Sequence, residues 1–370
     1  LGVFGLITAE FLPASLLTPM AASLGVTEGM AGQAVTATAL VALVTGLLIT
    51  SATKSIDRRW VLMFFSVLQI ISSLLVAFAP TLHVLLMGRL LLGIAIGGFW
   101  AMSTATAMRL VPADKVPKAL AVIFSSVSIA TVVAAPLGSY LGSLIGWRNV
   151  FILCILPSML ALLWQLWVLP SMKPESSGSL STLFRVLRRP GMIGGMLATI
   201  LIFSGHFAFF TYLRPFLETV GQVSVESISL ILLGFGIANF IGTSVAGHLL
   251  ARNLRLTLAL VPFAMGMLAL AMVLFGHLAM VDGLLVAMWG FAFGLVPVGW
   301  STWLATTVPD EAESAGGLLV ASIQFAISAG AAGGGAVFDL NGASGVFAGS
   351  GFLLVTAMVI VFMGVKVKAE

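Results

Sequence analysis

The chain has 370 residues, of which 60% are hydrophobic and only 8% are charged, whereas about a quarter of the residues in a soluble domain are charged. This excludes an ordinary soluble globule, which needs more polar surface, and it excludes disorder, which needs low hydrophobicity and high charge. The 17 basic residues barely exceed the 13 acidic ones, so no nucleic-acid partner is expected. A single cysteine, Cys154, rules out a disulfide framework and a cysteine-based metal site. The composition therefore predicts a protein that lies in the lipid bilayer.

Apolar stretches of about 20 residues, the length that crosses a bilayer as a helix, recur along the chain. We predict an all-α membrane protein with roughly twelve transmembrane helices, since barrel strands would alternate with polar residues. The expected spans are 1–24, 29–53, 60–80, 83–108, 117–143, 149–169, 191–219, 226–250, 257–276, 281–306, 315–339 and 345–365. Because the chain opens inside an apolar stretch without Met, we expect the first helix to be truncated at its N-terminus.

The charges and the central loop predict topology and domains. Most Lys and Arg residues fall in alternate loops and at the C-terminus, which by the positive-inside rule face the cytoplasm. Both termini of this multi-pass protein are then cytoplasmic. The longest hydrophilic stretch is rich in Pro, Ser and Gly, as linkers are. We therefore expect a six-helix bundle at 1–169, a cytoplasmic linker at 170–190 and a second six-helix bundle at 191–370.

The two halves repeat each other at one constant offset. Arg58 falls on Arg255, and the pairs Gly93 and Gly97 fall on Gly290 and Gly294. Val111-Pro112 falls on Val308-Pro309 at the same offset. Parallel six-helix repeats are typical of transporters that rock two bundles around a site at the bilayer midplane. A fold with duplicated helices and no transport role is the alternative.

Three local motifs accompany the repeat. The loop after the second span, TSATKSIDRRWVL, keeps the last two arginines and the leucine of the pattern G-x-x-x-D-R-x-G-R-R-x-x-L, but Asp57 replaces a glycine. The fourth span carries Gly88-Arg89 followed by Gly93 and Gly97, and the fifth span reads Ala134-Ala135-Pro136-Leu137-Gly138. The residues that we assign to conformational motifs are Arg58, Arg59, Pro136, Gly138, Gly247 and Arg252.

With these motifs the chain resembles the major facilitator superfamily and, within it, the drug:proton antiporter group. Stretches that begin at Glu10, Gly98, Phe207 and Val296 are most similar to exporters of purine ribonucleosides. The resemblance implies proton-coupled efflux of a small solute by alternating access between two pseudo-symmetric bundles. A sugar or multidrug exporter of the same family, a facilitator or symporter, and a transporter-like sensor remain alternatives.

Charged groups inside a bilayer are costly and are functional by default. We assign proton coupling to Glu10, Arg89 and His206, all within apolar spans. Alternatively, Glu10 makes a structural hydrogen bond, and Arg89 binds backbone carbonyls or extends its side chain to the membrane surface. His206, which lies one residue from the repeat position of Glu10, is alternatively a neutral imidazole bonded within the core or to the substrate. Arg214 and Asp339 lie nearer the outer ends and are expected at a solvated rim.

A cavity between the halves would need aromatic faces for a flat base and polar groups for a ribose. The candidates for substrate binding are Gln33, Phe99, Trp100, Phe210, Tyr212, Asn239, Trp300 and Gln324. Phenylalanine in a membrane helix more often faces lipid, and Trp often marks the interface. The chain shows no P-loop and no metal-ligand spacing among its four His residues. We therefore expect a monomeric transporter, not an enzyme, whose partners are protons, a nucleoside-like solute and lipid, without cofactor or metal.

Overall fold

The computed structural model describes residues 1–112, 116–172, 185–276 and 278–365. Over these ranges the regular structure is helical, which confirms the all-α prediction. Ten of the described helices are long and apolar enough to cross a membrane, and the number becomes eleven when a bent pair at the N-terminus is taken as one span. Most of the expected linker, residues 173–184, lies outside the described residues.

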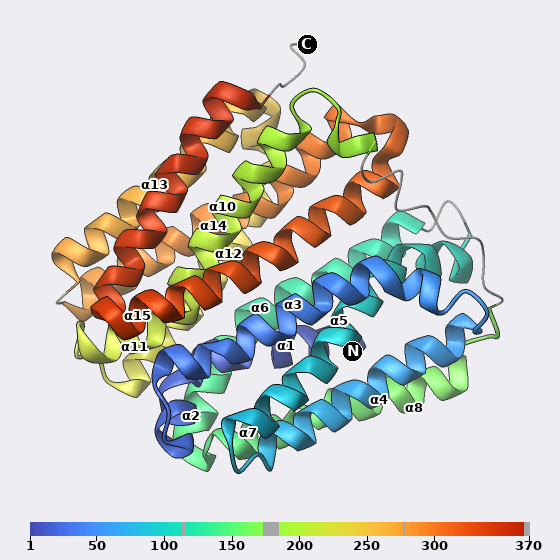
Figure 1. The fold of residues 1–370 in the computed structure, drawn as a ribbon, viewed down its shortest axis with the longest axis horizontal. Helices are drawn as coiled ribbons and strands as arrows, with labels where there is room; N and C mark the ends of the chain where they lie inside the picture. Colours follow the sequence, from blue (N-terminus) through green and yellow to red (C-terminus); the bar gives the residue numbers. More distant parts are fainter. Residues whose placement is uncertain (113–115, 173–184, 277, 366–370) are drawn as a thin grey trace.

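The helices before and after the linker occupy different parts of the molecule (Figure 1). The first group comprises α1 (Gly2–Ser15), α2 (Leu17–Leu24), α3 (Glu28–Ala52), α4 (Arg58–Ala77), α5 (Leu82–Leu110), α6 (Val116–Ile145), α7 (Trp147–Leu153) and α8 (Ile155–Val168). The second group comprises α10 (Met192–Thr211), α11 (Leu213–Thr219), α12 (Val225–Arg252), α13 (Leu254–Phe275), α14 (Ala279–Thr307) and α15 (Ala312–Gly364). The groups meet mainly where α3 packs on α15 and α6 packs on α12.

The first expected span is not one straight helix. The chain bends by 68° between α1 and α2, at Leu16, whose φ of −114° and ψ of 12° leave the helical region. Pro13 lies inside α1, and a proline there removes one backbone donor and crowds the preceding turn. The break follows this weakened turn.

The last two expected spans are joined without a loop. α15 runs for 53 residues, about 80 Å at 1.5 Å per residue, far beyond the roughly 30 Å of a hydrocarbon core. It contains Gly342 with φ 67° and ψ −172°, a conformation that favours glycine. Two helical segments therefore meet at a kink at Gly342, where the sequence predicted an interhelical loop.

The internal repeat is visible in the packing of the glycines. Gly93 and Gly97 of α5 lie against the backbone carbonyls of Thr38 and Ala42 on α3. At the equivalent positions, the carbonyls that lie against Gly290 and Gly294 of α14 are those of Phe235 and Asn239 on α12. Each glycine and its contact in the first group falls on its counterpart in the second at the same offset. The offset found in the sequence thus describes a repeated helix-to-helix packing, because a Cβ at any of these glycines would collide with the neighbouring helix.

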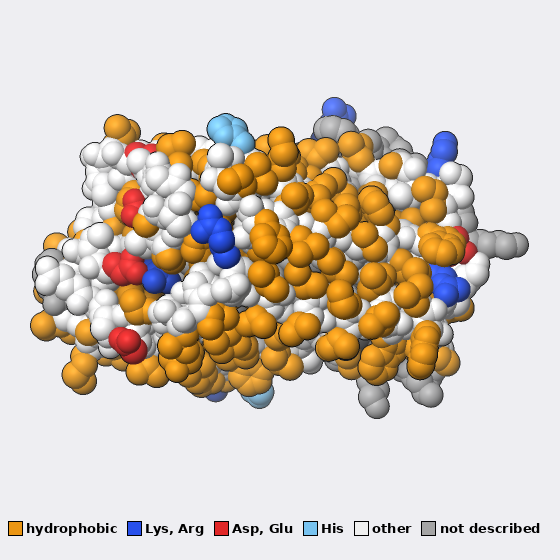
Figure 2. Space-filling view, turned by 90° about the horizontal axis from the view of Figure 1, so that it is seen from below, with side chains coloured by type: hydrophobic (Ala, Val, Ile, Leu, Met, Phe, Trp, Pro, Cys, Tyr) orange, Lys and Arg blue, Asp and Glu red, His pale blue; other side chains and the backbone are white. Residues whose placement is uncertain are grey.

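The surface is that of a membrane protein. Large apolar side chains are widely exposed, as at Phe64, Phe352 and Met280. Figure 2 shows hydrophobic side chains across the middle of one face, while the visible acidic ones lie toward its two ends, most of them at one. Patches of this extent are rare on soluble monomers. Trp164 and Trp167 are also exposed near the end of α8, as expected of interfacial anchors.

Candidate functional site

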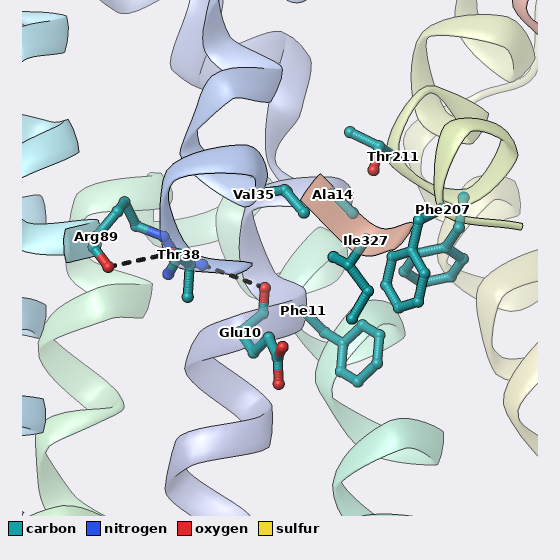
Figure 3. A pocket seen from close by; sticks show the side chains of 10 residues that line it. Glu10, Phe11, Ala14, Val35, Thr38, Arg89, Phe207, Thr211 and Ile327 are labelled. Atoms are coloured by element: carbon teal, nitrogen blue, oxygen red, sulfur yellow. Dashed lines mark hydrogen bonds between the residues drawn. The ribbon is translucent and has the colours of Figure 1, made fainter. Parts of the chain in front are cut away.

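A small cavity, with room for about one water molecule, lies where α1, α3, α5, α10 and α15 meet. Figure 3 shows side chains from these helices turned toward one another. The cavity is lined by Glu10, Phe11, Ala14, Val35, Thr38, Arg89, Phe207, Phe210, Thr211 and Ile327. Because these residues come from both sides of the linker, the cavity lies between the two groups of helices.

Arg89 enters this region from α5 and is held by backbone oxygens. Its Nη1 donates to the Ala9 carbonyl at 2.7 Å and its Nε donates to the Ala34 carbonyl at 3.1 Å. A third, longer bond of 3.4 Å joins Nη2 to the backbone oxygen of Glu10. The arginine thus adopts the carbonyl-bonded alternative, and the carboxyl group of Glu10 is not its hydrogen-bond partner.

Pro13 explains why a carbonyl of α1 accepts from Arg89. In a regular helix the N–H of residue 13 would donate to the carbonyl of Ala9, but proline has no N–H. A buried carbonyl left without a donor is costly, so another donor must supply the bond. The guanidinium of Arg89 satisfies the Ala9 oxygen. One proline therefore both weakens α1 and positions the buried arginine.

The carboxyl group of Glu10 faces the cavity. Figure 3 shows its two oxygens directed away from Arg89, beside Phe11. Within the described part of the chain, no hydrogen bond or ion pair engages this carboxyl group, whereas Arg89 contacts the main chain of the same residue. Glu10 is the acidic side chain among those that line the cavity. Its carboxyl group is therefore placed to exchange a proton or to bind a ligand.

Three phenylalanines form an aromatic wall of the cavity. Phe11 of α1 lies nearly parallel to Phe207 of α10, with ring centroids 6.3 Å apart and an interplanar angle of 16°. Phe210, one turn further along α10, meets Phe11 edge to face at 5.7 Å. Such faces can stack on a flat aromatic ligand.

His206 does not line the cavity and lies instead among the helices that follow the linker. Its Nδ1 accepts a hydrogen bond of 3.0 Å from Nε1 of Trp289, and its ring stacks on Phe293 at 3.3 Å with an interplanar angle of 4°. A protonated imidazole donates from both nitrogens and cannot accept the Trp289 bond. The structure thus shows a neutral, core-bonded histidine.

Of the predicted substrate-binding residues, one lines the cavity and seven do not. Phe210 forms part of its wall. The other candidates are Gln33, Phe99, Trp100, Tyr212, Asn239, Trp300 and Gln324. Of these seven, Gln324 lies on α15 one turn before the lining residue Ile327 and therefore on the same face of the helix. Its buried Oε1 has no hydrogen-bond partner among the described residues.

Several of the remaining candidates have partners inside the protein. The Tyr212 hydroxyl donates to the Ala331 carbonyl at 3.1 Å, and the Asn239 amide donates to the Gly290 carbonyl at 3.3 Å. Phe99 and Trp100 are half-buried and pack against each other at 5.7 Å. Trp300 lines a separate space bounded by α10, α12, α13 and α14, and Gln33 is exposed.

Arg214 is not at a solvated rim, so that prediction was wrong. Its side chain is 6% exposed, pairs with Glu218 at 2.7 Å and donates to the Ser15 carbonyl of α1. The chain leaves α10 at Tyr212 and turns into the short helix α11, which carries the arginine inward over the end of α1. Asp339 is exposed as expected and accepts a hydrogen bond of 3.2 Å from Thr27.

Sequence reasoning also missed the cavity residues Phe11, Phe207 and Thr211, and the buried carboxylic acid Asp282 on α14. Phe11 adjoins Glu10, and Phe207 occupies the repeat position of Glu10, so the repeat was the available signal for both. Nothing in the sequence distinguishes Thr211 from other helical threonines. Asp282 lies in the first turn of its helix, where an acidic residue is ordinary.

The basic loop between α3 and α4 binds the segment that follows α8. Arg58 donates from Nη1 to the Thr53 hydroxyl at 2.6 Å, and Arg59 donates to the Leu166 carbonyl at 2.8 Å. Asp57 accepts from the backbone N–H groups of Arg59 and Met172 and from the Ser171 hydroxyl. These hydrogen bonds, first that from Ser171, lower the pKa of the Asp57 carboxyl group. The aspartate that replaces the motif's glycine thus caps α4 and anchors Met172.

The remaining motif residues differ in their surroundings. Pro136 and Gly138 are buried in α6, and a Cβ at Gly138 would lie 2.7 Å from the Ser15 hydroxyl of α1. Gly138 therefore allows α1 and α6 to approach closely. Gly247 and Arg252, near the end of α12, are exposed, and nothing lies within 4 Å of a Cβ at Gly247.

Apolar helices around an enclosed site with an acidic and an aromatic lining, between two repeated halves, define a membrane transport protein. The sequence profile of the Major Facilitator Superfamily matches residues 1–331. The chain therefore belongs to the major facilitator superfamily and is a multi-pass membrane protein of that transporter family.

Relatives and solved structures agree with this family. The chain is 49% identical over 356 residues to the purine ribonucleoside efflux pump NepI of Salmonella paratyphi B, covering 96% of this chain and 90% of the relative. It is 48% identical to the same-named pump of Escherichia coli O6:H1, covering 98% and 92%. Its fold is similar to that of the nucleoside transporter NupG, with a TM-score of 0.77 and 18% identity over 98% of this chain and 99% of that one. A bacterial homologue of the human lysosomal transporter Spinster, in an inward-facing and occupied conformation, has a TM-score of 0.77 and 13% identity over 98% and 94%.

Proposed function

We propose that the protein exports purine ribonucleosides and their analogues from the bacterial cytoplasm in exchange for protons. The observation that carries the proposal is the 49% identity to a purine ribonucleoside efflux pump over 96% of the chain. The cavity supports it, because the aromatic wall of Phe11, Phe207 and Phe210 suits a flat base and the carboxyl group of Glu10 suits a proton or a hydroxyl.

Membership of the family supports the proposed transport architecture. The bent pair counted as one span, together with α15 counted as two, gives roughly twelve spans. We assign residues 1–169 and 191–370 to two bundles that rock about the cavity, with both termini in the cytoplasm and the protein acting as a monomer in the inner membrane. The cavity as it stands is much smaller than a typical ligand site, so we propose that a nucleoside enters only when the bundles part.

In the proposed cycle the cavity alternates between holding the nucleoside, with Glu10 ionised, and releasing it, with Glu10 protonated. The ionised carboxyl group retains the solute arriving from the cytoplasm, and a proton from outside neutralises that group and weakens retention. Release of the proton inward then allows the next solute to bind. Arg89 remains charged throughout, because its guanidinium does not deprotonate in practice, and it keeps α1 and α5 in register by bonding to the Ala9 carbonyl.

Transport in proteoliposomes tests the direction and the substrate together. The protein is reconstituted, an inward or outward pH gradient is imposed, and flux is measured for labelled inosine, adenosine, a sugar and a cationic drug. We expect purine ribonucleosides to move against the proton gradient. Movement of nucleosides in the same direction as protons would identify a symporter, and nucleoside flux that does not depend on the pH gradient would identify a facilitator. Preference for the sugar or the drug would reject the nucleoside assignment.

A further inference from the structure

Thr211 carries a hydroxyl group without a hydrogen-bond partner at the wall of the cavity. The side chain is fully buried, and its Oγ1 makes no hydrogen bond among the described residues. The residue lines the cavity together with Glu10 and Phe207. Figure 3 shows the Thr211 side chain extending toward the other lining residues, with its oxygen on the side of Ala14 and Ile327. Buried hydroxyls are normally bonded, so this one is available to bond a ligand in the cavity.

Many threonines of these helices bond to the turn before them, whereas Thr8, Thr18 and Thr36 share with Thr211 a buried hydroxyl that has no partner among the described residues. Of these four, Thr211 is the one that lines the cavity. Thr199 of α10 donates to the Gly195 carbonyl at 2.9 Å, and Thr131 of α6 donates to the Val127 carbonyl at 2.9 Å. This bond to the fourth preceding carbonyl is the ordinary solution for a helical threonine. Thr211 is the last residue of α10, where the helix is interrupted at Tyr212. At this helix end the hydroxyl is turned to the cavity.

We propose that the Thr211 hydroxyl binds a ribose hydroxyl of the exported solute and thereby selects ribonucleosides over their deoxy analogues. The inference rests on the proposed nucleoside transport and deepens it. A base stacked on the rings of Phe11 and Phe207 leaves the sugar to extend beyond them. Thr211 lies four residues after Phe207 on the same face of α10, about 6 Å along the helix at 1.5 Å per residue. This places a hydrogen-bonding group beside the rings at the spacing of a sugar from its base.

Such a contact discriminates between solutes that carry the matching hydroxyl group and solutes that lack it. A site built around a buried hydroxyl rejects a ligand that lacks the matching group, because the protein group is then left unpaired. Binding of inosine and of its 2′-, 3′- and 5′-deoxy analogues to purified protein in detergent therefore identifies the contact. For the wild type we expect one analogue to bind about tenfold more weakly than inosine, as the loss of one hydrogen bond predicts.

Two substitutions at the same position separate the hydroxyl from the shape of the side chain. Thr211→Val keeps the volume and removes the hydroxyl, so inosine is expected to bind about as weakly as the discriminated analogue and the difference between them to disappear. Thr211→Ser keeps the hydroxyl and should retain the discrimination. Thr199→Val, on the same helix and outside the cavity lining, is the matched control and should bind like the wild type. Thermal unfolding of each variant confirms that it is folded.

The outcomes distinguish this inference from the proposed function. If the wild type binds no ribonucleoside, the proposed function fails and the inference fails with it. If the wild type discriminates between inosine and an analogue and the valine variant does so equally, the proposed function stands and the Thr211 contact is rejected. Equal weakening of inosine and every analogue in the valine variant would also reject a sugar contact.

Discussion

Glu10 and His206 occupy nearly equivalent places in the two halves but have opposite surroundings. The carboxyl group of Glu10 faces the cavity and has no bonding partner in the described chain. The imidazole of His206 is bonded to Trp289 and stacked on Phe293. The difference comes from one residue of register, because each step along a helix turns the side chain by about 100°. At the constant offset that relates Gly93 and Gly97 to Gly290 and Gly294, Glu10 corresponds to Phe207, which lines the cavity.

The comparison shows that two titratable residues at similar depth can differ in whether their polar atoms are free to change partner. Glu10 meets this condition and His206 does not in this conformation. In the proposed function, Glu10 therefore exchanges the proton and Arg89 positions α1, whereas His206 packs within the second half. The predictions below test the two regions in order of expected effect.

The largest effect is expected when Arg89 is replaced. Arg89→Met removes the donor to the Ala9 and Ala34 carbonyls, and with Pro13 in place no helical N–H can satisfy Ala9. We expect a loss of roughly 3–5 kcal/mol in the free energy of unfolding, since a buried charge-assisted network is broken and the Ala9 carbonyl is left unpaired, whereas the Ala34 carbonyl still accepts from the Thr38 hydroxyl. Thermal unfolding in detergent measures it, with the exposed Arg188→Met as control. Equal melting temperatures for the two variants would show that Arg89 does not hold α1.

The repeat predicts matched effects in the two halves. Gly97→Ala and Gly294→Ala each place a Cβ against a carbonyl of the neighbouring helix, that of Ala42 or of Asn239. We expect each to lower the free energy of unfolding by about 1–3 kcal/mol, as overpacking does. Gly349→Ala, where nothing lies within 4 Å, is the control. A neutral result in one half only would mean that the halves are not packed alike.

The His206 region is expected to respond as a hydrogen-bonded core. His206→Phe leaves the Trp289 N–H without its acceptor, which should cost about 1–3 kcal/mol. The double variant with Trp289→Phe removes both partners and should recover part of that loss. Chemical or thermal unfolding of the two single variants and the double variant gives the coupling. Strictly additive losses would contradict a direct bond between the two side chains.

The smallest effect is expected at the cytoplasmic loop. The pKa of Asp57 is lowered in the folded protein, so its bonds stabilise the fold above the unfolded pKa, about 4, and are lost as the pH falls through the folded value. Ser171→Ala removes one of these bonds, raises the pKa of Asp57 and shifts the acid loss of stability to higher pH. Melting temperatures between pH 3 and 6 measure the shift, with Ser143→Ala as control. An unshifted acid limb would show that Ser171 does not act on Asp57.

Much of the fold was predictable from the sequence, because it follows from composition and periodicity. The all-α architecture, the family and the repeated glycine contacts are confirmed. The break after α1 and the merging of the last two spans at Gly342 were missed, since both depend on single backbone positions inside apolar runs. Pro13 was visible in the sequence, but the Ala9 carbonyl that it leaves without a helical donor was not recognised as an acceptor for Arg89.

The site was predictable only in part, because membership of a cavity depends on helix rotation. Glu10, Arg89 and Phe210 line it, whereas His206 and Trp300 do not. Apolar spans have little contrast between faces, so the periodic signal that orients a soluble helix is weak here. Whether Arg214 is buried and whether Thr211 has a partner depend on the turn between α10 and α11, which no local pattern specifies.

The central claim is that Glu10 exchanges the transported proton, and Glu10→Gln tests it most directly. Inosine flux is measured in proteoliposomes with and without an imposed pH gradient, together with inosine binding at equilibrium, for this variant, for His206→Gln and for the wild type. We predict that Glu10→Gln binds inosine but gains no flux from the pH gradient, whereas His206→Gln retains a gradient-driven flux. Undiminished proton-driven efflux by Glu10→Gln would contradict the account.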